Sequence, residues 1–339
     1  MMKLAGSRLL RAALLISLGW LSGAHASEDL ACNAPSADAG HRQRALSQSR
    51  RGVTAIAVAP DGNAIGVASS DGRLRLLDAS GALEIRTLKD RGGVIVEGLA
   101  FSADGRDLMA VSGDSLGKVW SADTGEVRLT LRGHEHALRA VAESADGLLI
   151  ATGGEEARVM LWDGQTGQLE RTLSGATDFV NALSFSPDGH WLASGGADGR
   201  ILVWDLVSGE LLHMLCGHMG AINSVAFNAA GSLLASGGED GQVFLWDPLE
   251  GKRIQALTGH LGAVRSLAFG RDGGLLASGT QGGRVVVWDM ATHQVVQDFA
   301  EGAGAVNAVA FGAKNQNRLF VGTEAKGVLS WAVSRGAAK

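Results

Sequence analysis

The chain has 339 residues, of which 46% are hydrophobic, 19% charged and 5% aromatic, with 49 glycines, 4 prolines and 2 cysteines. Enough apolar surface is present for a packed interior, so an intrinsically disordered chain is excluded, and the few prolines and cysteines exclude collagen and a disulfide-stapled miniprotein. The formal net charge of −5 argues against a nucleic-acid partner, because such partners usually require a basic patch.

The start of the chain has the pattern of a secretory signal peptide. Basic residues precede an uncharged apolar stretch that ends in Ala24-His25-Ala26; they are Lys3, Arg8 and Arg11. A bilayer span needs about 20 apolar residues, and this stretch is shorter. We therefore expect residues 1–26 to be a removed signal peptide and residues 27–42 to be a tail. The mature protein is expected in the bacterial periplasm or secreted, with no membrane span; an uncleaved anchor is the alternative.

The two cysteines leave several states open. Cys32 follows the predicted cleavage site closely, which allows a lipid-modified amino terminus, but Asp29 stands where lipidation signals usually have leucine. An oxidising compartment would also allow Cys32 to pair with Cys216. Free thiols are the third possibility, and the sequence does not choose among the three.

A repeat of 42 residues runs through the rest of the chain. Five tryptophans follow one another at this spacing: Trp120, Trp162, Trp204, Trp246 and Trp288. Trp331 lies 43 residues after the last of them, and Leu77 lies 43 residues before the first. The pattern therefore predicts seven structural repeats.

Each repeat contains only strand and turn signals. Between Asp178 and Gly209, short apolar runs are separated by Asp188-Gly189 and Asp198-Gly199, and a further run covers Leu211 to Leu215. Asp-Gly pairs are typical of hairpin turns because both residues tolerate positive φ. Four strands cannot bury both faces of their sheet alone, whereas seven sheets arranged radially can. We predict an all-β, seven-bladed propeller of four-stranded antiparallel blades.

The repeats resemble those of the WD40 family of β-propellers over residues 43–335. Trp-Asp occurs at 162–163, 204–205, 246–247 and 288–289, and Gly-His occurs at 133–134, 217–218 and 259–260. Each of these histidines lies 28 residues before the matching tryptophan. The resemblance covers a single domain, expected over residues 43–339.

The resemblance implies a buried polar relay of His, Asp, Ser or Thr, and Trp in each repeat. The repeat ending at Trp246 has the full set, with His218, Asp240 and Ser236. Other repeats keep part of it: His134 with Trp162, Asp198 with Trp204, and His260 with Trp288. The departures are Glu156 and Gly282 at Asp positions and Ala176 at a His position. Buried polar groups that find partners avoid a desolvation penalty, so we expect a structural role for these histidines rather than metal binding or catalysis.

In the family, each repeat supplies the outer strand of one blade and the inner strands of the next. Only Ala332 to Lys339 follow Trp331, so the last blade lacks an outer strand. We predict that residues 43–48 fill this place and close the ring, which removes the last open sheet edge.

The resemblance also implies a wide face around the central channel, where a partner would bind. The equivalent positions near the start of each innermost strand are mostly Ala or Gly, so Phe179 and Ile95 are exceptional. The expected partner-binding residues are Phe179, Ile95, Arg139, Arg265, Glu97, Glu239, Asn181 and Asn223. An exposed aromatic residue near arginine is typical of a binding hot spot. The alternative is that Phe179 repairs the packing where Ala176 replaces histidine.

The resemblance, together with the lack of a credible catalytic constellation, predicts a non-enzymatic interaction scaffold or accessory subunit of the cell envelope. Its partner is expected to be a protein or peptide, with no metal or cofactor, and the protein is expected to be monomeric on its own. The alternative is a small-ligand or anion site, possibly enzymatic, with Arg139 and Arg265 in the channel. Gly113–Gly117 matches the Gly-x-Ser-x-Gly pattern of hydrolases but falls in an expected hairpin turn, whereas that motif requires a strand followed by a helix.

Overall fold

The computed structural model describes residues 44–47, 52–80, 83–88, 94–260, 262–300, 304–312 and 318–334. The chain divides into two units, Met1–Gly40 and His41–Lys339. The predicted signal peptide, the predicted tail and Cys32 lie outside the described residues. All that follows concerns the second unit.

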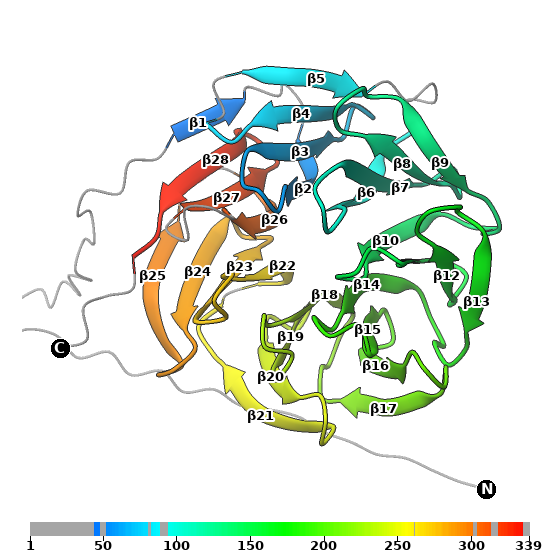
Figure 1. The fold of residues 1–339 in the computed structure, drawn as a ribbon. Coiled ribbons are helices and arrows are strands. Elements are labelled where there is room, and N and C mark those ends of the chain that lie inside the picture. Colours follow the sequence, from blue (N-terminus) through cyan, green and yellow to red (C-terminus); the bar gives the residue numbers. More distant parts are fainter. Residues whose placement is uncertain are drawn as a thin grey trace, which may run out of the picture. The chain divides into compact units, whose positions relative to one another are not determined.

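This unit is a propeller of seven four-stranded antiparallel sheets, as the repeat pattern predicts (Figure 1). Blade 1 comprises β2 (Val53–Val58), β3 (Ala64–Ser69), β4 (Leu74–Asp78) and β5 (Glu84–Leu88). Blade 2 comprises β6 (Val96–Phe101), β7 (Asp107–Ser112), β8 (Gly117–Ser121) and β9 (Val127–Leu131). Blade 3 comprises β10 (Leu138–Glu143), β11 (Leu149–Gly154), β12 (Val159–Asp163) and β13 (Leu169–Leu173).

The remaining blades repeat the plan. Blade 4 comprises β14 (Val180–Phe185), β15 (Trp191–Gly196), β16 (Arg200–Asp205) and β17 (Leu211–Cys216). Blade 5 comprises β18 (Ile222–Phe227), β19 (Leu234–Gly238), β20 (Val243–Asp247) and β21 (Lys252–Leu257). Blade 6 comprises β22 (Val264–Phe269), β23 (Leu275–Thr280), β24 (Arg284–Asp289) and β25 (Gln294–Ala300). Blade 7 comprises β26 (Val306–Phe311), β27 (Arg318–Thr323), β28 (Gly327–Ala332) and β1 (Arg44–Ser47).

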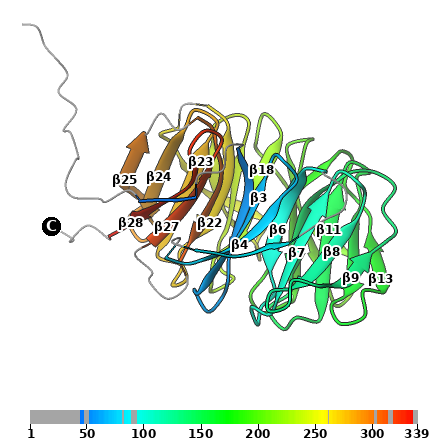
Figure 2. The ribbon, with the colours of Figure 1, turned by 90° about the horizontal axis from the view of Figure 1, so that it is seen from above.

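The predicted closure of the ring is confirmed. Strand β1 pairs antiparallel with β28, and Arg44 lies opposite Ser330. The innermost strands of neighbouring blades contact one another around the whole ring, including β26 with β2 (Figure 1). Figure 2 shows β3 of blade 1 next to β6 of blade 2. Strands from both ends of the domain therefore share one blade, and no sheet edge is left open at the junction.

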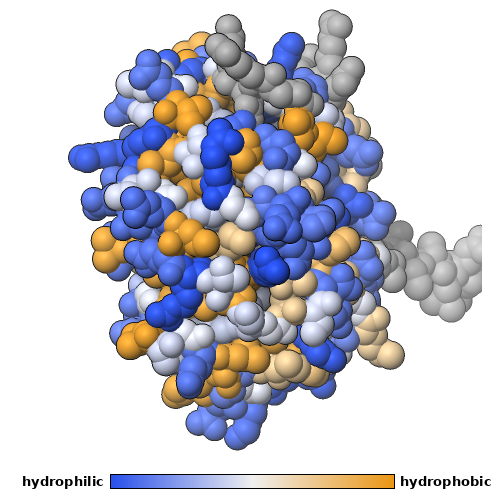
Figure 3. All heavy atoms as spheres, turned by 90° about the vertical axis from the view of Figure 1, so that its right-hand side faces the viewer, coloured by the Kyte–Doolittle hydropathy of each residue, from blue (hydrophilic) through white to orange (hydrophobic). Residues whose placement is uncertain are grey.

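The position of a strand in its blade explains its sequence. The third strand β20 is buried at its first four residues because neighbouring blades cover both of its faces, so it reads as a continuous apolar run. The outer strand β13 is buried only at Leu173 and is otherwise polar or exposed. On the side drawn in Figure 3, apolar residues accordingly form separate clusters among hydrophilic ones.

The core lies between blades rather than within them. One cluster joins Leu161 of blade 3 to Leu202 and Trp204 of blade 4, and the side chain of Trp204 has no exposed surface. Equivalent clusters join the other neighbouring blades. No blade can bury its apolar residues without its neighbours, so the repeats are stable only as an array.

The Asp-Gly pairs form the turns that the sequence predicts. Between β14 and β15, Asp188 accepts hydrogen bonds from the hydroxyl of Ser186 and the backbone N–H of His190. Gly189 follows with φ of 73°, a left-handed conformation that costs glycine nothing. Equivalent Ser-x-Asp bonds close the turns after β6 and β10. These turns connect the first and second strands of their blades.

Candidate partner-binding site at the channel mouth

Seven side chains line the central channel because each innermost strand has a bulge at its second residue. In blade 4, Val180 pairs with Gly196 and Ala182 pairs with Gly195, so Asn181 is skipped. A bulge leaves the extra residue outside the ladder and changes the direction of its side chain. The seven skipped residues are Thr54, Glu97, Arg139, Asn181, Asn223, Arg265 and Asn307.

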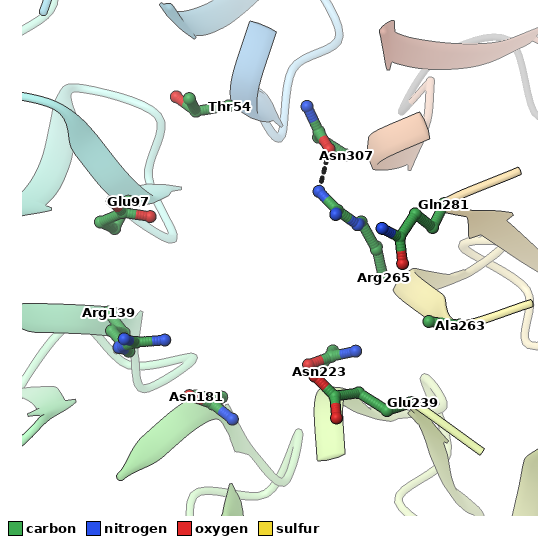
Figure 4. Close-up of a pocket in the computed structure, with 10 residues that line it drawn as sticks. All are labelled: Thr54, Glu97, Arg139, Asn181, Asn223, Glu239, Ala263, Arg265, Gln281 and Asn307. Atoms are coloured by element: carbon green, nitrogen blue, oxygen red, sulfur yellow. Dashed lines mark hydrogen bonds between the residues drawn. The ribbon is translucent and has the colours of Figure 1, made fainter. Parts of the chain in front are cut away.

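These residues enclose a cavity of about 340 Å³ (Figure 4). Glu239 and Gln281, from the turns that follow β19 and β23, complete its lining together with Ala263. The cavity is within the usual size range of ligand pockets, but its walls are polar rather than apolar. Six of the eight predicted partner-binding residues lie here: Glu97, Arg139, Asn181, Asn223, Glu239 and Arg265.

Three asparagines of the lining tie neighbouring blades together. The Nδ2 atom of each donates to the carbonyl oxygen of the first residue of the next innermost strand. The distances are 3.1 Å from Asn181 to Ile222, 3.0 Å from Asn223 to Val264 and 2.7 Å from Asn307 to Val53. The hydroxyl of Thr54 makes the same bond to Val96 at 2.8 Å. The amide groups of Asn181 and Asn223 therefore have a structural role in addition to the predicted partner-binding role.

Phe179 lies at the rim, against an arginine of the neighbouring blade. The guanidinium carbon of Arg139 is 5.0 Å from the centre of the Phe179 ring, in a cation–π contact. The same guanidinium donates to Glu155 at 2.8 Å. The Phe179 side chain remains 37% exposed. The three residues thus form one contact group whose aromatic member is exposed to solvent.

That Phe179 repairs the packing at Ala176 stays the alternative to partner binding. The apolar cluster around Trp204 includes Ala176, the residue at the vacant histidine position, but Phe179 is not part of that cluster. Phe179 contacts Arg139 instead. Ile95, the other exceptional rim residue, is 42% exposed. That a partner binds these two residues stays a prediction.

The polar relay of blade 5 contains all four expected residues in hydrogen-bonding contact. Nδ1 of His218 lies 3.0 Å from both carboxylate oxygens of Asp240, and Nε2 lies 2.8 Å from the Ser236 hydroxyl. The indole N–H of Trp246 donates to the same hydroxyl at 2.8 Å. The backbone N–H of Met219 also donates to Asp240, at 2.9 Å. The set therefore joins an outer loop, two strands and a turn of one blade.

In the repeats that depart from the full set, other residues provide hydrogen-bond partners for the buried polar groups. In blade 3, Glu156 contacts Nδ1 of His134, and Thr152 accepts from the indole N–H of Trp162 at 2.7 Å. In blade 4, where histidine is absent, Asp198 contacts the Thr177 hydroxyl. The indole N–H of Trp204 donates to the carbonyl oxygen of Ser174 at 3.4 Å. Asp198 and Trp204 therefore do not belong to one network, unlike their counterparts in blade 5.

Blade 6 lacks the acid of the relay. Nε2 of His260 lies 2.6 Å from the Ser278 hydroxyl, and its ring stands edge-on to Trp288. Its Nδ1 atom is buried and has no hydrogen-bond partner among the described residues. Glycine at position 282 accounts for this, because no carboxylate is present to accept from Nδ1.

Comparison with known families agrees with the repeat geometry. The family model described as WD domain, G-beta repeat matches residues 40–78, 125–163, 167–205, 209–247 and 251–289, which together make up more than half of the chain. The chain belongs to the WD40 repeat family. WD40 propellers generally serve as protein-interaction scaffolds and are typically non-enzymatic. No curated protein matches this chain.

Two WD40 blades escape the family model although the structure contains them. The matched stretches omit residues 79–124 and 290–339, where Ser121 and Ala332 follow the blade tryptophan instead of Asp. Blades 2 and 7 nevertheless have the same four strands and the same inner-strand bulge. The spacing of 42 or 43 residues detects them because it depends on strand lengths rather than on a dipeptide.

Burial controls the charge of the relay histidines in this WD40 propeller. It lowers the pKa of His260 to about 4, and the nearby Arg284 acts in the same direction. Burial also lowers the pKa of His134 and of His218, although the hydrogen bond to Asp240 acts against it at His218. These rings are therefore neutral at neutral pH, as their hydrogen bonds to Ser and Thr hydroxyls allow.

Within the described ranges, the structure gives no support for a metal site or for a serine-hydrolase site. There, no group of three or more His, Cys, Asp or Glu side chains lies close enough to hold a metal ion. Ser115, within the Gly-x-Ser-x-Gly match, lies in the turn between β7 and β8 rather than between a strand and a helix. Cys216 is exposed and forms no disulfide within the described ranges, which do not include Cys32. A search of the same residues finds no helix of the length and hydropathy needed to cross a bilayer.

Sequence reasoning missed a second cavity, of about 590 Å³, at the opposite end of the inner strands of blades 2 and 3. Glu143 lines it, and the backbone N–H of Ala103 donates to its carboxylate at 2.6 Å. Burial raises the pKa of this carboxyl. The repeat spacing in the sequence could have indicated Glu143. It lies 42 residues from both Phe101 and Phe185 and occupies the position where those blades have phenylalanine.

Proposed function

We propose that this WD40 propeller is an interaction scaffold or accessory subunit of the bacterial cell envelope, which binds a protein or peptide at the channel mouth. The observation that carries the proposal is the rim group of Phe179, Arg139 and Glu155. Its aromatic ring is 37% exposed and lies 5.0 Å from a guanidinium that is itself fixed by a carboxylate. Exposed aromatic and arginine residues on a rigid support are typical of interface hot spots.

The location in the envelope rests on the amino-terminal pattern. Three basic residues, a short uncharged apolar stretch and Ala24-His25-Ala26 are typical of a signal peptide. Export would place the propeller where no nucleotide cofactors are at hand, which favours a binding role over cofactor-dependent chemistry. A protein partner in the same compartment is the simplest match to a polar channel with an apolar rim.

The proposal is tested by placing a photo-crosslinking amino acid at position 179 in the native host. A matched control carries it at position 207, because Val207 is also apolar, is 77% exposed and lies in the turn between β16 and β17 at the opposite end of blade 4. We expect a discrete protein adduct from position 179 alone. Equal adducts from both positions, or none from position 179, would contradict partner binding at the channel mouth.

A variant with Phe179→Ala separates binding from folding. Because Phe179 is not part of a core cluster, we expect the melting temperature to remain within about 2 °C of the parent, as exposed substitutions usually cost below about 0.5 kcal/mol. We expect binding of the partner identified by crosslinking to be lost.

Fractionation of the same cells by osmotic shock tests export. Retention of the chain in the cytoplasm would overturn the envelope location.

A further inference from the structure

The channel lining contains hydrogen-bond acceptors that receive no hydrogen bond from the described residues. A backbone carbonyl can only accept, so the bonds from Asn181 and Asn223 fix which end of each amide faces the neighbouring blade. One N–H of each amide is thereby engaged by the neighbouring blade. The Oδ1 atoms of both residues accept no hydrogen bond from the described residues, and that of Asn181 is buried. The Thr54 hydroxyl donates its proton to the carbonyl oxygen of Val96, so only its acceptor sites remain available.

The charges of the lining point the same way. Glu97 and Glu239 are exposed to the channel and have no basic partner within 4.0 Å among the described residues. Arg139 is neutralised by Glu155. The remaining cation, Arg265, donates to the Oδ1 atom of Asn307 at 2.8 Å (Figure 4). The uncompensated charges are thus two carboxylates and one guanidinium, with a net charge of −1.

The anion site considered from the sequence requires Arg139 and Arg265 together. One of them is already paired with a carboxylate, and the two unpaired glutamates would repel an anion. A cation with several N–H donors would instead be attracted, because carboxylates and amide oxygens accept its hydrogen bonds. Hydrogen bonds between an ionised donor and a carboxylate are about twice as strong as neutral ones.

We infer that the channel is a socket for a basic side chain, lysine or arginine, which the partner inserts between Glu97 and Glu239. This inference rests on the proposed function, since it names the chemistry of the partner at the same site. Phe179 and Ile95 then contact apolar residues that flank the basic residue, while Arg139 positions the Phe179 ring. Arg265 sets one limit of the socket and favours a neutral or acidic neighbour on that side.

The test uses four capped pentapeptides, Gly-Gly-X-Gly-Gly, with Arg, Lys, Gln or Glu as the central residue. Each is titrated into the mature protein, and binding is measured by chemical-shift changes. We expect the Arg and Lys peptides to bind at least about fivefold more tightly than the Gln peptide, which corresponds to about 1 kcal/mol, and the Glu peptide to bind most weakly. Raised salt is expected to reduce the preference, because the channel is open to solvent.

The decisive variant carries Glu97→Gln and Glu239→Gln. Its control carries Glu170→Gln and Glu250→Gln, which removes the same charge from exposed positions outside the cavity. We expect the preference for basic peptides to disappear in the first variant and to persist in the second, with equal melting temperatures. Equal loss in both variants, a preference for the Glu peptide, or no binding of any peptide would overturn the socket.

Failure of the socket and failure of the proposed function give different results. Crosslinking from position 179 together with a reversed peptide preference leaves the scaffold function standing and removes the basic socket. A preference for basic peptides without any adduct from position 179 supports the socket and contradicts a protein partner at the rim.

Discussion

At the residue scale, the polar relay shows how single hydroxyl groups support the blades. In blade 5 the Ser236 hydroxyl contacts both the ring of His218 and the indole of Trp246. In blade 4 the equivalent tryptophan uses a backbone carbonyl, and Ser194 makes no such contact. Serine is buried at both positions, so the two blades provide an internal comparison of the same residue with and without its partners.

Replacing Ser236 with alanine is expected to lower the free energy of unfolding by about 2–6 kcal/mol. The reason is that two buried donor or acceptor groups lose their partner at once, at roughly 1–3 kcal/mol each. Chemical denaturation measures the change. The matched control is Ser194→Ala, for which we expect less than about 1 kcal/mol. Similar losses in the two variants would show that the relay adds no stability beyond packing.

At the element scale, the bulge on each innermost strand and the bonds across neighbouring strands decide what the channel contains. The bulge removes the second residue of the strand from the ladder. Where that residue is asparagine, its amide donates a hydrogen bond to the next blade. The same element that forms the wall therefore also supplies the site. At the outer rim of blade 7, strand β1 pairs with β28 and covers its edge.

Removal of β1 is expected to lower the melting temperature. A chain that begins at Gly52 exposes the edge of β28, and a loss of about 2 kcal/mol would lower the melting temperature by roughly 4 °C in a domain of this size. Calorimetry on this chain and on a chain that begins at His41, which keeps β1, gives the comparison. Equal melting temperatures would mean that closure by the amino-terminal strand contributes nothing to stability.

At the scale of the whole propeller unit, stability is shared among the blades because the core lies between them. Clusters such as that of Leu161, Leu202 and Trp204 join each blade to the next. A local change in one blade therefore affects the free energy of unfolding of the entire ring. The buried histidines of blades 3, 5 and 6 contribute to that free energy together.

Stability is expected to fall as the pH drops from about 6.5 to about 4.5. The pKa values of His134, His218 and His260 are lowered in the folded state, to about 4 for His260, so in this range the unfolded chain binds protons that the folded chain does not. Each histidine contributes up to about 1.4 kcal/mol per pH unit. Chemical denaturation across this range measures the slope. His260→Gln should reduce the slope by the share of one histidine, and an unaltered slope in this variant would contradict the argument.

The sequence by itself determined the number of blades and their four-stranded plan, and its resemblance to WD40 repeats implied the ring closure and the positions that face the channel. The physical reason is that the blades follow from local properties repeated at a fixed interval, namely strand-length apolar runs and Asp-Gly turns with positive φ. Even the blades with Ser121 and Ala332 in place of Asp are found in this way.

The tertiary structure alone decided which groups in the channel are already engaged. Sequence position places Arg139 and Arg265 in equivalent roles, yet Arg139 contacts Glu155 and Phe179 whereas Arg265 contacts Asn307. Likewise, only the structure directs the amides of Asn181 and Asn223 to neighbouring carbonyls. These pairings depend on side chains from different blades meeting around a closed ring, and no interval along the chain encodes which of them reach each other.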